Sequence, residues 1–328
     1  MRPLLRHPMV WRLVALVAFA GAVWYFAADG RRAPMPVVQD DGGAAATTWA
    51  DADWDVFTTK ARLALDLGWD TLPAPAAMAR LGRTFVGTAY VPKTLDPDGP
   101  ERLVVNFRGL DCVTFVETVV SLIRFVRQPG AEDLLADRGA AEDTYEELLA
   151  DLRYRNGVVD GYASRLHYFS EWLAVNAERG LVRPLTRELG GVQDAEPIDF
   201  MSTHPDAYRQ LADSTVLAEI QRMEGGLNQA PRWVLPESEI AAAAQGIESG
   251  DIIAATSTVE GLDVAHTGFA LWEDGTLRLL HAPLVGEEVQ ISERSLAERI
   301  VAIEGQDGIM VARPLPDSSS RTASDGAS

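Results

Sequence analysis

The sequence predicts an α+β fold, because its hydrophobic pattern changes from helical to strand-like along the chain. In the first half, apolar residues recur every three or four positions, most clearly over Cys112–Val126. In the second half, short apolar runs are separated by turn signals, and Asp274-Gly275 joins two of them as a hairpin. Helices that come first, followed by a compact antiparallel sheet, are typical of the α+β class.

The individual elements follow from the same periodicities. Asp111 precedes the clearest helix and is its expected N-cap. Helices are predicted over 54–67, 75–81, 112–126, 144–154, 166–176 and 204–223. Strands are predicted over 251–255, 266–272, 276–282, 288–291 and 309–313.

Composition describes a soluble globular chain with a strongly acidic surface. The 328 residues are 47% hydrophobic and 23% charged, with a formal net charge of −19. Such a surface repels phosphates at long range, and no block of Lys or Arg opposes it. We therefore expect neither nucleic-acid binding nor attraction to anionic lipid.

The N-terminus, residues 1–30, predicts a signal peptide or a membrane anchor. Arg2, Arg6 and Arg12 precede an uncharged run over 13–28, which is short for a membrane span but typical of a signal-peptide core. The best cleavage site is Ala28-Asp29-Gly30, whereas the bulky Trp24-Tyr25-Phe26 leaves an uncleaved anchor as the alternative. Either way, the leading positive charge places the rest of the chain outside the cytoplasm, in the periplasm or cell envelope.

The rest of the chain divides into three parts. Residues 31–48 are rich in Ala, Gly and Pro and are predicted to form a flexible linker. Residues 316–328 are mostly small and polar and predict a disordered tail. One globular domain is expected between them, over 49–315.

Cys112 is the only cysteine, so it cannot form a disulfide within its own chain. It is therefore a buried filler, a redox sensor or a nucleophile. Its position at a helix N-terminus favours the thiolate, because unpaired backbone N–H groups and the helix dipole stabilise negative charge there.

Two of the five histidines could supply a base for this thiol. His266 and His281 lie on the predicted strands that flank Asp274-Gly275. If the turn has two residues, Glu273 pairs with Thr276 and both histidines fall on one face of the sheet; a three-residue turn would separate them. On one face, one imidazole can act as base while the other fixes its orientation. Two independent histidines on a half-exposed hairpin are the alternative.

Other chemistries have weaker support in the sequence. There is no His-Glu-x-x-His or Cys-x-x-Cys motif, and a zinc site of His266, His281 and Asp263 rests on residue type alone. No Gly-x-Ser-x-Gly elbow or phosphate-binding glycine loop is present. We therefore expect neither a metal nor another cofactor.

A series of short motifs resembles the NlpC-type papain-like cysteine hydrolases, which cut bacterial cell-wall peptides. They are Gly87-Thr88-Ala89-Tyr90, Leu110-Asp111-Cys112, Gly250-Asp251-Ile252-Ile253, His266-Thr267-Gly268 and Leu280-His281-Ala282. Val113-Thr114-Phe115-Val116-Glu117 and several stretches between nucleophile and base resemble one branch, the N-acetylmuramoyl-L-alanine amidases formerly catalogued as a domain of unknown function. The resemblance implies a papain-like fold, with a helical insert at about 130–245.

The resemblance also implies roles. Cys112 would be the nucleophile, His266 the general base and His281 the residue that orients His266. Tyr90 would lie beside the thiol and support the oxyanion or hold substrate. The branch-like residues of the insert would contact substrate: Arg165, His167, Tyr168, Met201 and Ser202.

The implied substrates and partners are muropeptides, fragments of peptidoglycan. The bond cut would be the amide between the lactyl group of N-acetylmuramic acid and L-alanine, through a thioester. The alternatives are an endopeptidase that cuts within the stem peptide, a muropeptide-binding protein without activity, and a thiol redox switch that needs a partner cysteine. Pro283, where the branch has Ser, is a departure that leaves the catalytic residues in place.

Overall fold

The computed structural model describes residues 49–316. The predicted signal peptide or anchor, the linker and nearly all of the predicted tail lie outside these residues. Within 49–316, no helix is both long enough and apolar enough to cross a membrane.

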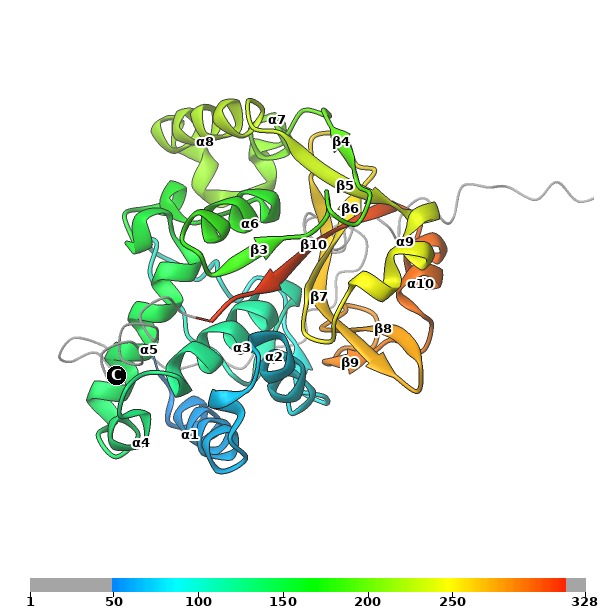
Figure 1. The fold of residues 1–328 in the computed structure, drawn as a ribbon. Helices are drawn as coiled ribbons and strands as arrows, with labels where there is room; N and C mark the ends of the chain where they lie inside the picture. The colour runs from blue at the N-terminus through cyan, green and yellow to red at the C-terminus, as the bar shows by residue number, and fades with distance from the viewer. Residues whose placement is uncertain (1–48, 317–328) are drawn as a thin grey trace, which may run out of the picture.

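Helices dominate the first half of the described chain, as predicted. The most buried is α3 (Cys112–Val126), whose two ends are those that the sequence predicted. Its neighbours in the same layer are α1, α2 and α5, and Figure 1 shows them gathered on one side of the sheet. The remaining bounds are α1 Asp51–Asp66, α2 Ala74–Arg83, α4 Ala131–Leu134, α5 Arg138–Arg153, α6 Phe169–Glu178, α7 Phe200–Thr203, α8 Ser214–Leu227, α9 Glu237–Ala243 and α10 Leu296–Ala302.

Within residues 49–316, the strands form one large sheet and one small one. The small sheet pairs β1 with β2 in parallel, and the large sheet has eight strands in the order β4-β5-β10-β6-β7-β8-β9, with β3 also paired to β10. Pairing throughout the large sheet is antiparallel, which confirms the α+β class. The bounds are β1 Ala89–Tyr90, β2 Gly109–Leu110, β3 Val182–Pro184, β4 Val192–Asp194, β5 Arg232–Pro236, β6 Ile252–Ser257, β7 Val264–Glu273, β8 Thr276–His281, β9 Gln290–Ile291 and β10 Gln306–Pro314.

The two faces of the large sheet carry separate hydrophobic clusters. Alternate residues such as Ile252 and Phe269 pack with α3 in the larger cluster. The intervening residues, such as Ala255 and Leu279, pack with α9 and α10 in the second. Figure 1 shows α9 and α10 on the opposite side of β7 from α2 and α3. The sheet is therefore the middle layer of three.

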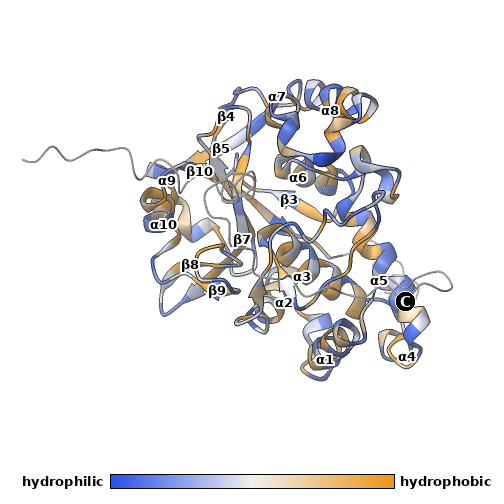
Figure 2. Cartoon of the chain, turned by 180° about the vertical axis from the view of Figure 1, so that it is seen from behind, coloured by the Kyte–Doolittle hydropathy of each residue, from blue (hydrophilic) through white to orange (hydrophobic). Residues whose placement is uncertain are grey.

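Residues 130–245, predicted to be a helical insert, also supply β3, β4 and β5 to the large sheet. A third cluster, which includes Tyr168, Phe200 and Ile220, holds α7 and α8 together. On α8, hydrophilic and hydrophobic stretches alternate, as Figure 2 shows for this peripheral helix. The insert is thus part of the domain and extends the sheet at the β4 edge.

Of the six predicted helices, all except 112–126 differ from the structure at their ends. The helix predicted over 204–223 was wrong in its first half, where two 3-10 turns, Pro205–Ala207 and Arg209–Ala212, precede α8. The side chain of Asp213 accepts a hydrogen bond from the Thr215 N–H and starts α8 there. In the same way, Asp137 caps α5 earlier than predicted, while α6 begins later, at Phe169.

Candidate active site

Cys112 lies at the first position of α3, and local hydrogen bonds fix it there. Asp111 Oδ1 accepts from the backbone N–H groups of Val113 (3.1 Å) and Thr114 (2.8 Å), and Thr114 Oγ1 accepts from the Asp111 N–H (2.8 Å). This capping box confirms Asp111 as the N-cap. Strand β2 immediately precedes it, with Leu110 paired to Tyr90 of β1. The thiol is therefore held between a short strand and a capped helix.

The sheet meets Cys112 at Thr267. The Thr267 hydroxyl donates to the Cys112 carbonyl at 2.7 Å, and both residues are buried. Pairing between β7 and β8 ends at Phe269 and Leu280, so Thr267 lies just beyond the stretch that β8 covers. Cys112 therefore packs against β7 where that strand has lost its β8 neighbour, and one residue from His266.

The hairpin has the register on which the histidine hypothesis depended. Asp274 and Gly275 both have positive φ (48° and 75°), and Glu273 pairs with Thr276, so the turn has two residues. His266 Nε2 and His281 Nδ1 are 2.7 Å apart, and both rings are buried. The prediction that the two imidazoles hydrogen-bond is confirmed.

This hydrogen bond restricts the tautomers. If both rings are neutral, one of the two bonded nitrogens carries a proton and the other accepts it. When His266 donates through Nε2, its Nδ1 has no proton and is free to accept one. His281 then carries its own proton on Nε2. Within residues 49–316, neither ring hydrogen-bonds to the Cys112 sulfur, so Nδ1 of His266 is not engaged by it.

Charge around the thiol opposes the thiolate that the helix N-terminus was expected to favour. Burial and the negative charge of Asp111 raise the pKa of Cys112 to about 12, although hydrogen bonding by Thr267 acts the other way. Burial and the positive charge of Arg299 hold the pKa of both His266 and His281 well below the usual range. The resting site therefore contains a neutral thiol and two neutral imidazoles, and the expectation of a thiolate is corrected.

The phenol of Tyr90 interacts electrostatically with Cys112 and Asp111. Burial and the charges of Cys112 and Asp111 strongly raise the pKa of its phenol, so the hydroxyl stays protonated and can donate. The Tyr90 N–H donates to the Glu287 carbonyl at 2.7 Å. Tyr90 thereby links the strand before the thiol to the loop that follows His281.

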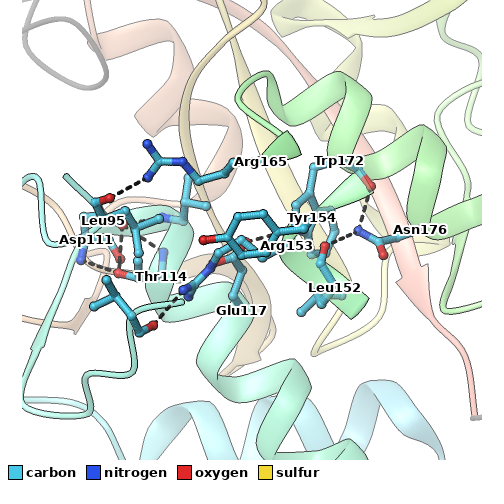
Figure 3. A network of polar contacts seen from close by, with 12 residues as sticks. Leu95, Asp111, Thr114, Glu117, Leu152, Arg153, Tyr154, Arg165, Trp172 and Asn176 are labelled. Atoms are coloured by element: carbon cyan, nitrogen blue, oxygen red, sulfur yellow. Dashed lines mark hydrogen bonds and ion pairs between the residues drawn. The ribbon is translucent and has the colours of Figure 1, made fainter. Parts of the chain in front are cut away.

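Arg165, expected to contact substrate, is occupied within the protein. Its Nη2 donates to Asp96 at 2.6 Å, its Nη1 to the Leu95 carbonyl at 2.9 Å, and its Nε lies 3.4 Å from Glu101. Tyr154 also donates to Glu101, at 2.8 Å. Figure 3 shows Arg165 and Tyr154 within this network. Arg165 therefore anchors the 91–108 segment, which leads to the nucleophile.

Of the other four predicted substrate residues, the structure brings three together in the insert, around Glu224, and places His167 against Tyr162 instead. The Tyr168 hydroxyl donates to Glu224 (2.8 Å) and accepts from the Met201 N–H (2.8 Å), while the Ser202 N–H also donates to Glu224 (3.1 Å). His167 Nε2 lies 2.8 Å from the Tyr162 carbonyl. These contacts fix the shape of the insert through groups internal to the protein.

The network in Figure 3 also contains a buried ion pair that sequence reasoning missed. Arg153 Nε donates to Glu117 Oε2 at 2.7 Å, Arg153 Nη1 to the Val104 carbonyl at 2.7 Å, and Trp172 Nε1 to Glu117 Oε1 at 3.2 Å. The charge of Arg153 also lowers the pKa of Asp111, although burial gives a net rise. The one sign of this ion pair in the sequence is Glu117, an acidic residue within a mostly apolar helix, which needs a buried partner.

The carboxylate of Asp263 is engaged by backbone N–H groups and does not join the two histidines as a third metal ligand. Asp263 Oδ2 accepts from the Ser170 N–H and Oδ1 from the Val264 N–H, both at 2.7 Å. Its carboxylate thus fixes the start of α6 and the entry to β7. Over the described residues, no group of three or more His, Cys, Asp or Glu side chains is arranged to hold a metal ion.

Comparison with known proteins agrees with the fold and the motifs. Residues 80–306 match the family described as AmiA-like, N-acetylmuramoyl-L-alanine amidase-like. The crystal structure of an N-acetylmuramoyl-L-alanine amidase from Bacteroides uniformis is 33% identical, with a TM-score of 0.67, and the match covers 74% of this chain and 99% of that one. The chain belongs to this amidase-like family, and the relationship supports a cell-wall amidase.

Two further structures are similar. A Bacteroides fragilis protein described as a xylanase is 32% identical with a TM-score of 0.65, over 71% of this chain and 98% of that one. A Legionella pneumophila protein shares the fold at 19% identity and a TM-score of 0.57, over 81% of this chain and 95% of that one. No curated protein matches the chain.

Proposed function

We propose that the protein is a cysteine-dependent N-acetylmuramoyl-L-alanine amidase with an NlpC-type, papain-like fold. The observation that carries the proposal is the buried His266–His281 hydrogen bond of 2.7 Å, one residue along the chain from the Thr267 contact to Cys112. A thiol beside an oriented imidazole is equipped for acyl transfer. Glycoside hydrolysis, by contrast, normally uses two carboxylates that flank the bond.

The proposed reaction begins with a neutral Cys112 thiol and a neutral His266 imidazole. Nδ1 of His266 takes the proton of Cys112 as the sulfur attacks the amide carbonyl, and the carbonyl electron pair moves onto oxygen. The Tyr90 hydroxyl and the Cys112 N–H stabilise this oxyanion. The tetrahedral intermediate collapses, the C–N bond breaks, and His266 returns the proton to the leaving amine.

Water completes the reaction in the second half. It attacks the thioester carbonyl and gives a proton to His266; the carbon–sulfur bond breaks, the acid is released, and Cys112 recovers its proton. His281 accepts a hydrogen bond from His266 Nε2 throughout, which fixes the ring and leaves Nδ1 as the proton-accepting nitrogen. With a muropeptide as substrate, the acid released is the lactyl carboxylate of N-acetylmuramic acid, and the amine released is that of L-alanine.

Mass spectrometry of products from defined muropeptides tests the proposal. The wild type should release the intact L-alanyl peptide and leave the sugar unbroken. Cys112→Ala and His266→Ala should lose at least about a thousandfold in kcat, whereas His204→Ala, which removes a ring that stacks on Phe200 in the insert, should retain activity. A split within the stem peptide would instead make the protein an endopeptidase, and full activity of Cys112→Ala would overturn the cysteine mechanism.

We also propose that the enzyme acts in the periplasm or cell envelope, because residues 1–30 have the pattern of an export signal or anchor. N-terminal sequencing of the protein from a fractionated cell tests this. A cytoplasmic protein that still begins at Met1 would contradict it.

A further inference from the structure

Arg299 of α10 is a cation beside the active site that lacks an acidic partner. Its side chain is half-buried, and its Nη1 donates to the Gln306 side-chain oxygen at 3.2 Å. No carboxylate lies within salt-bridge distance of it among residues 49–316. Arg153 and Arg165, the buried arginines of the adjoining network, both pair with carboxylates.

Strand alternation places Arg299 in the layer that carries the two histidines. Ala255, the cross-strand partner of His266, and Leu279, two residues before His281, belong to the cluster on the α9 and α10 face. Leu296 and Ile300, which flank Arg299 on α10, pack into the same cluster. Gln306, which holds the guanidinium, begins the central strand β10. Arg299 and the imidazoles therefore share one side of the sheet.

The electrostatic effects of Arg299 agree with this placement. Its charge lowers the pKa of both histidines, and it interacts with Cys112 as well. Burial without a counterion lowers the pKa of Arg299 itself to about 10. Such a cation is unfavourable until an anion arrives, and a guanidinium binds a carboxylate through paired hydrogen bonds.

The proposed function, on which this inference rests, indicates which part of the substrate brings the anion. His266 protonates the leaving amine, so the peptide half of the substrate lies on the histidine side of the sulfur. The carboxylates of a muropeptide are on that half, because the lactyl carboxyl of the sugar is consumed in the amide bond. We propose that Arg299 is a specificity-determining residue that binds a carboxylate of the peptide half of the substrate.

Substrate binding would then also prepare the base. A carboxylate on Arg299 offsets the positive charge that disfavours protonation of His266, so the imidazole becomes a stronger base when the correct substrate is bound. Substrates that lack the carboxylate would leave His266 a weak base, which lowers kcat as well as raising KM.

Matched acid and amide substrates test the proposal. They are N-acetylmuramoyl-L-alanine and its C-terminal amide, and N-acetylmuramoyl-L-alanyl-D-glutamate and the corresponding diamide. For at least one pair, the wild type should prefer the acid by about 10–100-fold in kcat/KM, the effect of one charge-assisted pair. Arg299→Gln should bring that ratio close to one, Arg299→Lys should restore part of it, and the exposed Arg294→Gln should keep the wild-type ratio.

Binding to a Cys112→Ser background, measured by calorimetry, separates this proposal from the proposed function. Preferential binding of the acid that disappears with Arg299→Gln supports the carboxylate site even if the wild type turns over none of the probes. An acid-to-amide ratio that is the same in wild type and Arg299→Gln, in proteins of equal Tm, overturns it. So does the absence of any acid preference in both pairs.

Discussion

The protonation state of Cys112 can be measured directly from its alkylation by iodoacetamide. Only the thiolate reacts, so the logarithm of the rate rises with slope one until pH passes the thiol pKa. An ordinary thiol, with a pKa of about 8.5, is about one-quarter ionised at pH 8. With the pKa of Cys112 raised to about 12, about one thiol in ten thousand is ionised at that pH, which is roughly 2,000-fold less.

The shape of the pH profile is the measurement that matters, because burial also slows the reagent. Mass spectrometry should show a native rate that still climbs at pH 10, while urea-unfolded protein levels off near pH 9. Asp111→Asn should speed native alkylation, because it removes a negative charge beside the thiol and Asn still caps α3. Asp137→Asn, the same change at the cap of α5, should leave the rate unchanged.

A native profile that levels off below pH 8 would refute this reasoning. It would mean that the N-terminal dipole of α3 outweighs burial and Asp111, and that the enzyme rests as a thiolate–imidazolium pair. If the wild-type rate reaches a plateau and the Asp111→Asn profile is the same, the charge of Asp111 is also excluded as an influence on the thiol pKa.

Two other substitutions have clear expected outcomes. Arg153→Met leaves Glu117 buried without its partner and should lower the free energy of unfolding by about 3–5 kcal/mol, as measured by urea titration. A loss below about 1 kcal/mol would show that the ion pair is not buried in solution. Gly268→Ala would bring a new Cβ to 2.9 Å from the Cβ of His281, so kcat should fall at least about tenfold. The control, Gly225→Ala, has nothing within 4 Å of its new Cβ and should keep full activity. Equal kcat in the two variants would contradict the proposed role of His281 in orienting His266.

The hydrogen-bonded histidine pair could be predicted because its geometry is local. Two residues, Asp274 and Gly275, fix the turn, the turn fixes the register, and the register puts His266 and His281 on one face. The start of α3 is local in the same sense, since Asp111 and Thr114 cap it through their own side chains.

Apart from that of Asp111, the charges around the site could not be predicted, because they depend on contacts between distant segments. Nothing near Arg165 in sequence shows that Asp96 and Glu101 already occupy it. Likewise, the charge of Arg299 reaches the histidines only because α10 folds onto their side of the sheet. The helix N-terminus of α3 predicted a thiolate correctly in isolation, but burial within the three layers reversed the sign.

Burial and the two nearby charges, Asp111 and Arg299, keep the thiol and both imidazoles neutral. Asp111 disfavours the thiolate, and Arg299 disfavours the imidazolium, so each charge opposes one half of the ion pair that a resting cysteine enzyme would otherwise hold. The thiolate is the form that oxidants attack, so a neutral thiol is protected in the oxidising envelope proposed for this protein. Activation then has to come from the substrate, and a carboxylate that neutralises Arg299 while the scissile amide meets the sulfur would supply it. Selectivity and protection of the thiol would thus follow from the same arrangement of charges.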